Sequence, residues 1–196
     1  MNTEIEAKWL NYNHDDIRKK LILCGAVLQQ KERLMTRKVF DYPDKRLEKM
    51  NGWVRVRHEG DKITLSYKQL NDRTIHGTEE VTVVVNDFDA TSSFLESIGL
   101  KSYSYQETKR ESWKIGDVEI ELDTWPWIPP FIEIEAPDEK SLVQVAADLG
   151  LDYSKALHGS VETAYQAVYN VTEEEIDNWQ EITFSEVPLW LMAKKK

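Results

Sequence analysis

The 196-residue sequence lacks the features that mark secreted and membrane proteins. It has one cysteine, Cys24, so no disulfide bridge can form within the chain. No apolar run approaches the roughly 20 residues that a membrane-spanning helix requires. The first residues, MNTEIEAKWL, lack the basic and then apolar pattern of a signal peptide. These absences predict a soluble protein of the reducing cytoplasm, with no membrane partner.

Histidine and basic residues are also scarce. The four histidines are scattered without the spacing of a metal site, so we assign them no catalytic role. The chain has 25 basic and 35 acidic residues and a net charge of −10, which argues against a nucleic-acid partner. A polyanionic ligand would need locally concentrated arginine and lysine, or metal ions held by the surplus carboxylates. The oligomeric state stays open at this point.

The chain contains no Gly/Ser-rich or Pro-rich linker, and its length suits one barrel-sized domain. We therefore expect a single domain over residues 1–196. Near its end, Thr172 and Glu175 have the spacing of a capping box at a helix start. This spacing predicts a C-terminal helical segment over about 172–196.

Helices and strands are both expected. Three short amphipathic patterns, each followed by a glycine that can end a helix, predict helices near 13–24, 89–98 and 140–149. Alternating apolar and polar residues predict strands at 53–58, 63–68, 81–85, 118–123 and 131–136. The tight turns at 51–52, 59–61 and 116–117 are typical of antiparallel neighbours. Residues 4–7 (EIEA) recur as 133–136, and each copy precedes an expected helix, which indicates two related halves.

The polar faces of the expected strands carry formal charge, largely of one sign per strand. These residues are Glu4, Glu6 and then Lys8; Arg55 and Arg57; Glu119, Glu121 and Asp123; Glu133 and Glu135. Like charges repeated along one face repel, so opposite charges or a ligand must compensate them. For any single strand, solvent-exposed ion pairs are the simpler interpretation. For the whole set we favour an α+β fold, a closed antiparallel β-barrel with a charged lumen and helices packed outside.

Such a lumen suits a phosphorylated ligand. The planar forks of Arg55 and Arg57 can each donate two hydrogen bonds to one phosphoryl group. Lys8, Lys68 and Arg110 add positive charge. The carboxylates offer hard oxygen ligands for Mg²⁺ or Mn²⁺, which would turn their repulsion of the phosphate into a clamp.

The order of these motifs resembles that of a known family. The motif residues are Glu4-Ile5-Glu6-Ala7-Lys8 (an ExExK strand), Val54 to Arg57, Thr64 to Lys68, Glu79-Glu80, Lys109-Arg110, Glu121 to Thr124 and Phe131 to Glu135. Over nearly the whole chain they resemble the CYTH superfamily, also called triphosphate tunnel metalloenzymes. The resemblance implies an eight-stranded antiparallel tunnel and a divalent-metal-dependent reaction on a triphosphate.

The resemblance also implies residue roles. Metal ligands would be Glu4, Glu6, Glu133 and Glu135, with Glu80 and Asp123 as further candidates. Triphosphate contacts would be Lys8, Arg55, Arg57, Lys68 and Arg110, with Lys155 as the candidate for a late basic residue of some members. The ExExK residues Glu4, Glu6 and Lys8 would be catalytic. One departure from the family pattern is the turn over residues 125–130 (WPWIPP), which predicts a different tunnel mouth.

Three functions remain open at this stage. The first is hydrolysis of tripolyphosphate or of an organic triphosphate, such as a nucleoside or thiamine triphosphate, with Mg²⁺ or Mn²⁺ as cofactor. The second is a class IV-type adenylate cyclase, in which the ribose 3′-hydroxyl attacks the α-phosphate and pyrophosphate leaves. The third is a non-catalytic module that binds triphosphate or polyphosphate. We favour hydrolysis, because the sequence shows no base-binding motif.

Overall fold

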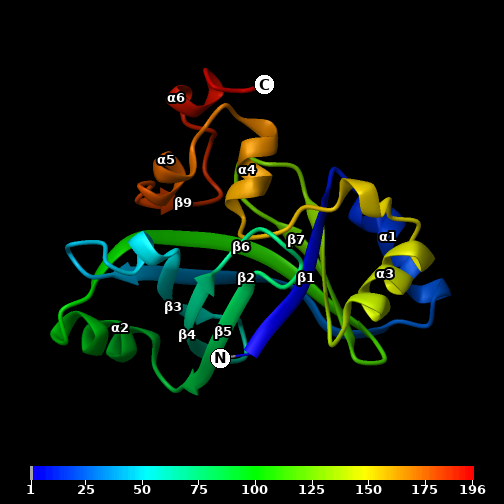
Figure 1. Ribbon diagram of the computed structural model, residues 1–196, viewed down its shortest axis with the longest axis horizontal. Helices are drawn as coiled ribbons and strands as arrows, with labels where there is room; N and C mark the ends of the chain where they lie inside the picture. The colour runs from blue at the N-terminus through cyan, green and yellow to red at the C-terminus, as the bar shows by residue number, and fades with distance from the viewer. Residues whose placement is uncertain (1) are drawn as a thin grey trace.

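The computed structural model describes residues 2–196 and has a β-barrel at its centre (Figure 1). In the described chain, neighbouring strands follow the order β2-β3-β4-β5-β1-β8-β7-β6, and β2 also pairs with β6, which closes the ring of eight. Every pairing within the ring is antiparallel. A ninth strand, β9, adds to β6 in parallel outside the ring. The predicted closed eight-stranded antiparallel barrel is confirmed.

The strands are β1 (Asn2–Leu10), β2 (Val27–Asp41), β3 (Gly52–His58), β4 (Ile63–Leu70), β5 (Thr78–Val85), β6 (Lys101–Ile115), β7 (Val118–Thr124), β8 (Phe131–Ala136) and β9 (Glu181–Ile182). The five strands expected from alternation are present, with ends that differ by a few residues. The two longest strands, β2 and β6, form a continuous ribbon along each other. Much of β2 is exposed on both faces, so its sequence lacks a clear alternation.

The helices are α1 (His14–Leu23), α2 (Phe88–Ser97), α3 (Glu139–Asp148), α4 (Glu162–Val168), α5 (Glu173–Asp177) and α6 (Leu189–Met192), with short 3₁₀ turns η1 (Glu48–Met50) and η2 (Tyr153–Lys155). The first three match the expected helices, and each is followed by a glycine with positive φ: Gly25, Gly99 and Gly150. The predicted capping box of Thr172 and Glu175 opens α5. Only α5 and α6 are helical between residues 172 and 196, so the C-terminal segment is less helical than expected.

The hydrophobic core lies outside the barrel wall, as the alternation predicts. Helices α1 and α3 lie together against one flank of the barrel, while α2 lies on another side (Figure 1). Leu21 of α1 and Leu142 of α3 are buried in one cluster with Trp9, Ile120 and Ile134 of the strands. A smaller cluster joins Leu95 of α2 to Val56 of β3. The apolar faces therefore point outward to the helices and leave the charged faces to the lumen.

The two copies of the internal repeat lie side by side. Ile5 pairs with Ala136 and Ala7 pairs with Ile134 on the antiparallel strands β1 and β8. The helices that follow them, α1 and α3, are also in contact, because Lys20 Nζ donates a hydrogen bond of 2.6 Å to the Leu149 carbonyl oxygen. The repeat thus brings two acidic strands together in the barrel.

The C-terminal segment packs over one side of the barrel through aromatic side chains (Figure 1). Tyr165 of α4 donates a hydrogen bond of 2.9 Å to the Pro126 carbonyl oxygen and packs edge-on against Trp125 and Trp179. The Trp- and Pro-rich turn at 125–130 is therefore anchored by the C-terminal segment. Among the described residues, no helix is both long and apolar enough to cross a membrane.

Candidate active site

The lumen of the barrel holds a cavity of about 270 Å³ that is lined by charged side chains. These come from strands β1 to β6 and β8: Glu4, Glu6, Lys8, Arg37, Arg55, Arg57, Lys68, Glu80, Arg110, Glu133 and Glu135. The inward direction of the charged faces is confirmed for β1, β3 and β8, whereas the charged residues of β7, Glu119, Glu121 and Asp123, are not among the lining residues. Residues of α4, α5 and β9 also line the cavity, among them Glu162, Ile176 and Ile182.

Charge in the lumen is arranged by strand. The carboxylates come from the adjacent strands β5, β1 and β8, and the arginines come from the adjacent strands β6, β2 and β3. Strand β2 is four steps from β1 in both directions, through β3, β4 and β5 or through β6, β7 and β8. The arginine-bearing wall therefore lies across the lumen from the acidic wall. A ligand between them would meet opposite charge on its two sides.

Lys8 is held at the centre of the acidic wall. Its ammonium lies 2.9 Å from a carboxylate oxygen of Glu6, 3.2 Å from one of Glu133 and 2.8 Å from the Gly159 carbonyl oxygen. Burial opposes the charge of Lys8, but the carboxylates of Glu133 and Glu6 raise its pKa above the usual value. The three donors of the ammonium are thus engaged, so a substrate phosphate would have to replace one of these acceptors.

A second lysine joins two acids in the same way. Lys68 Nζ lies 2.7 Å from Glu4 and 3.0 Å from Glu80. Burial and a hydrogen bond with Glu80 raise the pKa of Glu4 to about 8. Burial opposes ionisation of Glu80 too, but its hydrogen bond with Glu4 and the charge of Lys68 lower its pKa. The two carboxyl groups therefore titrate as a coupled pair, with Lys68 beside both.

The acidic wall carries more negative charge than its lysines offset. Glu135 lies opposite Glu6 in the register of β1 and β8, and its pKa is raised to about 7 by desolvation and then by Glu133 and Glu6. Carboxylate oxygens are the ligands that Mg²⁺ and Mn²⁺ prefer, so this donor set fits a hard divalent cation. In residues 2–196, no three acidic, histidine or cysteine side chains already converge as a metal site. Lys8 and Lys68 hold the carboxylates instead.

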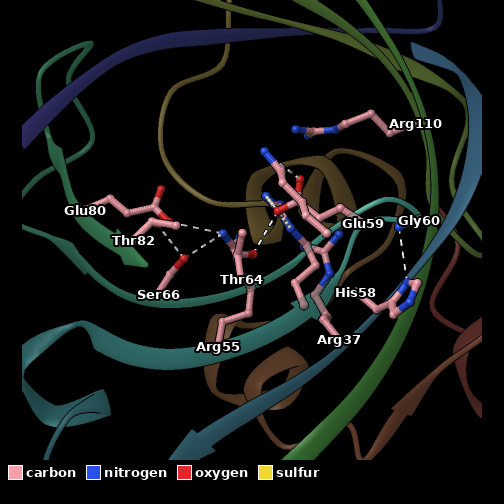
Figure 2. A network of polar contacts seen from close by, with 12 residues as sticks. Arg37, Arg55, His58, Glu59, Gly60, Thr64, Ser66, Glu80, Thr82 and Arg110 are labelled. Carbon is pink, nitrogen blue, oxygen red and sulfur yellow. Dashed lines mark hydrogen bonds and ion pairs between the residues drawn. The ribbon is translucent and has the colours of Figure 1, made fainter. Parts of the chain in front are cut away.

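The arginine-bearing wall is braced by acids. Arg57 donates hydrogen bonds of 3.0 and 2.7 Å to Glu59, which also accepts one of 2.8 Å from Thr64. Burial opposes the charge of Glu59, but Arg57 and Thr64 lower its pKa to about 2. Arg55 reaches Glu80 at 3.2 Å, beside Ser66 and Thr82 (Figure 2). These contacts fix the guanidinium groups toward the lumen.

Asp123 and Arg110 form a bidentate pair, with distances of 2.7 and 2.5 Å. Asp123 is 1% exposed and is not among the residues that line the cavity. The structure thus places this metal-ligand candidate behind Arg110 rather than in the lumen. Arg110 also reaches Glu133 at 3.2 Å, which links the basic and acidic walls.

Lys155 is placed away from the other candidates. It lies on η2, its side chain is 75% exposed, and it pairs with Asp152 at 3.7 Å. It does not line the cavity. Arg73, in the loop between β4 and β5, lines the cavity instead and pairs with Glu173 of α5.

Two residues escaped the sequence analysis: Glu59, which braces the arginine-bearing wall, and Arg37, which lines the lumen. Glu59 follows the end of β3 and was assigned to a turn, although it is 6% exposed and holds Arg57. Arg37 of β2 is also 6% exposed and lines the cavity. The available sequence signal was alternation along β2: the apolar Phe40 predicts an outward face, which places residues 37, 39 and 41 on the opposite face, and all three line the cavity.

Solved structures with the same fold come from bacteria, archaea and plants. A provisionally assigned adenylate cyclase from Vibrio parahaemolyticus has a TM-score of 0.73 and 18% identity, over 84% of this chain and 98% of that one. The PH1012 protein of Pyrococcus horikoshii has a TM-score of 0.65 and 24% identity, over 78% and 93%. The provisionally assigned adenylyl cyclase HpAC1 from Hippeastrum, with a dominant triphosphatase activity, has a TM-score of 0.57 and 14% identity, over 89% and 94%. At these identities the likeness concerns the fold.

No curated protein matches the chain. A family model for the CYTH domain matches residues 2–165, which include the eight strands of the ring and the charged lumen residues that they carry. With a closed antiparallel tunnel, opposed acidic and basic walls and this match, the chain belongs to the CYTH domain family.

Proposed function

We propose that the protein is a divalent-metal-dependent triphosphatase that hydrolyses tripolyphosphate or an organic triphosphate, such as a nucleoside or thiamine triphosphate. The observation that carries the proposal is the opposition of the two walls: arginines on β2, β3 and β6 lie across the lumen from carboxylates on β5, β1 and β8. An extended polyanion between these walls would be bound by guanidinium groups on one side. On the other side it would need cations, which the carboxylates can hold.

The arginines bind and orient the phosphate chain. Arg55, Arg57 and Arg110 are each held by an acid of the barrel, so their forks are positioned before the substrate enters. Fixed charges in a narrow lumen stabilise the charge that develops as the P–O bond breaks, because little water is present to screen them. Lys8 and Lys68 add two positive charges at the acidic wall.

The carboxylates of the acidic wall are the candidate metal ligands. Bound Mg²⁺ or Mn²⁺ would supply a Lewis acid for the phosphate oxygens at Glu6, Glu133 and Glu135, with Glu4 and Glu80 close by. The register places Glu6 directly opposite Glu135, and Lys8 opposite Glu133. Glu4, Glu6 and Lys8 of the ExExK strand are therefore our candidates for catalysis, because they lie where both metal and phosphate would meet.

Product analysis tests the proposal. Purified protein is incubated with tripolyphosphate, ATP or thiamine triphosphate, each with Mg²⁺, with Mn²⁺ or with excess EDTA. Glu6→Gln and Arg57→Ala remove one group from each wall. Glu96→Gln and Arg46→Ala are the matched controls, because both residues are exposed outside the lumen. Orthophosphate release that needs metal, and that is lost in the first two variants only, is the expected result.

Other products would change the assignment. Cyclic AMP together with pyrophosphate from ATP would identify an adenylate cyclase, which would use the same lumen with a different attacking group. Metal-dependent thermal stabilisation by tripolyphosphate without any turnover would identify a binding module; a ligand at a hundred times its dissociation constant adds about 2.7 kcal/mol. If the protein shows no turnover and tripolyphosphate does not stabilise it, the proposal of a triphosphate site in this lumen is refuted.

A further inference from the structure

Of the strand arginines that line the cavity, Arg37 is the one without an acidic partner in the described residues. Arg55 pairs with Glu80, Arg57 with Glu59 and Arg110 with Asp123. No ion pair joins Arg37 to a carboxylate anywhere in the described residues 2–196; its one side-chain hydrogen bond is from Nη2 to Thr108 Oγ1, at 2.8 Å. The barrel thus contains a buried guanidinium with no carboxylate of the described chain within ion-pair distance.

Part of this guanidinium is also without a hydrogen-bond acceptor. Arg37 is 6% exposed, and its Nε–H has no partner within the described structure. Arg55 Nε is buried without a partner in the same way. Buried donors are almost always satisfied, because removing them from water without a replacement is costly. Two such donors on neighbouring strands of one cavity are available to an acceptor that enters the lumen.

Trp125 fixes the direction of Arg37. The guanidinium carbon lies 4.6 Å from the centre of the Trp125 ring, in a cation–π contact. Trp125 is in turn held by an edge-on contact with Tyr165 of α4. One face of the guanidinium is therefore covered, and a ligand must approach along the edge of the plane, the geometry of bidentate phosphate binding.

The surroundings of Arg37 add to its positive field. On β2 it lies opposite Arg57 of β3, and Arg55 and Arg110 point into the same part of the lumen (Figure 2). Burial and the charges of Arg57, Arg55 and Arg110 lower the pKa of Arg37 well below its usual value, and Asp123 offsets this in part. Because the acidic partners of this cluster contact Arg55, Arg57 and Arg110 and none contacts Arg37, the edge of Arg37 is a site for an additional anion.

We propose that Arg37 binds a phosphoryl group of the substrate through its unpaired edge, and that Trp125 is the positioning residue that holds it there. The inference rests on the proposed function, because it assigns part of that lumen to the phosphate chain. Arg37 lies on the wall across from the acids of β1, so the phosphoryl group it holds is one that points away from those acids. Substrates with a chain of condensed phosphates fit this site.

The test separates ligand binding from a structural role. Arg37→Met keeps the length of the side chain and removes its charge, Arg37→Lys keeps the charge and removes the fork, and Arg46→Met is the surface control. Affinity for diimidotriphosphate, a hydrolysis-resistant analogue of tripolyphosphate, is measured by calorimetry with Mg²⁺. The unfolding temperature of each ligand-free protein is measured in parallel.

Arg37→Met is expected to weaken binding of the analogue about 10- to 100-fold, which is the range for charged hydrogen bonds. Its ligand-free unfolding temperature is expected to stay the same or rise, because an unpaired buried charge has been removed. Arg37→Lys should fall between wild type and Arg37→Met in affinity, and Arg46→Met should match wild type.

Three outcomes would overturn the assignment. Unchanged affinity in Arg37→Met, in a protein whose Arg57→Ala variant loses binding, would remove Arg37 from the site and leave the proposed function intact. Reduced affinity together with a lower ligand-free unfolding temperature would show that Arg37 supports the fold instead. Absence of binding to wild type would refute both proposals, whereas binding that depends on Arg37 without any hydrolysis would refute the triphosphatase alone.

Discussion

Glu6 and Glu135 are directly opposed on the antiparallel strands β1 and β8, and both side chains line the lumen. Two carboxylates in this relationship repel each other, and the pKa of Glu135 is accordingly raised to about 7, by desolvation first and then by Glu133 and Glu6. A cation between the two strands would relieve this repulsion. The pairing therefore links the stability of the barrel to the metal that we propose for it.

Replacing Glu135 by Gln should make the metal-free barrel more stable at pH 8 but not at pH 4. Because the folded pKa of Glu135 is raised above its unfolded value, the wild type loses stability as pH rises from about 4.5 to about 7. The variant lacks this group and should lose less over that range. Urea unfolding in EDTA at several pH values measures the difference.

With saturating Mg²⁺ the wild type should become more stable than Glu135→Gln, because the ion stabilises only the protein that retains the Glu135 carboxylate as a ligand. Glu96→Gln serves as the control, since Glu96 is exposed on α2. A Glu135→Gln variant with the stability profile and Mg²⁺ response of the wild type would contradict the interpretation of this pair.

Glu59→Gln should weaken both the fold and substrate binding. The folded pKa of Glu59 is about 2, below its unfolded value of 4.5, so its contribution to stability is present above pH 4.5 and is lost as pH falls toward 2. We expect a loss of about 1–2 kcal/mol at pH 7 after solvent screening. Because Glu59 holds Arg57, KM for the triphosphate should rise more than kcat falls.

Chemical denaturation at pH 7 and pH 3 checks this expectation, together with steady-state kinetics. Asp44→Asn is a suitable control, because Asp44 is exposed and pairs with Arg46 outside the lumen. Equal losses of stability at both pH values would show that Glu59 acts through packing and not through its charge.

Charge alternation made the barrel predictable from sequence. Residues 4, 6 and 8 of β1 and 133 and 135 of β8 carry charge at every second position, while Ala7 and Ile134 between them are buried. A single strand with that pattern can face solvent, but several such strands in one sheet need a ligand or opposite charge, and closure of the sheet provides both. The EIEA repeat was also visible in the sequence, but the pairing of its two copies on β1 and β8 could not be predicted from it.

The misplaced and overlooked residues have physical explanations. Lys155 was proposed as a triphosphate contact although no expected strand contains it. In the structure it lies on the short 3₁₀ turn η2 at the surface. Arg37 lies in the half of β2 that reads TRKVFD, where inward Arg37 and outward Lys38 carry the same charge, so no charged face stands out. Asp123 alternates in phase with the lumen acids, yet its bidentate contact with Arg110 keeps it in the wall. Such pairings depend on neighbouring strands far apart in sequence.

Leu142→Ala should destabilise the protein without changing its chemistry. Leu142 of α3 is fully buried in the core that covers the outer faces of β1, β7 and β8. Removal of such a side chain leaves a cavity and costs about 2–5 kcal/mol. Because the lumen lies on the other side of the barrel wall, kcat per folded molecule should be unchanged at a temperature where the variant remains folded. Ile22→Ala, at an exposed position of α1, should change neither quantity.

Lys8→Met provides the sharpest test of how the acidic wall is balanced. Its ammonium compensates Glu6 and Glu133 from within hydrogen-bond distance, so its removal leaves two carboxylates without their counter-charge. We expect the metal-free variant to lose about 3–5 kcal/mol, as when one partner of a buried ion pair is deleted. A divalent cation can supply the missing charge, so Mg²⁺ should raise the unfolding temperature of Lys8→Met more than that of wild type. Hydrolysis should still fall, because we propose that Lys8 also contacts the phosphate of the substrate. Thermal unfolding with and without Mg²⁺ measures the first effect, and an equal Mg²⁺ response in the two proteins would mean that these carboxylates do not hold the metal.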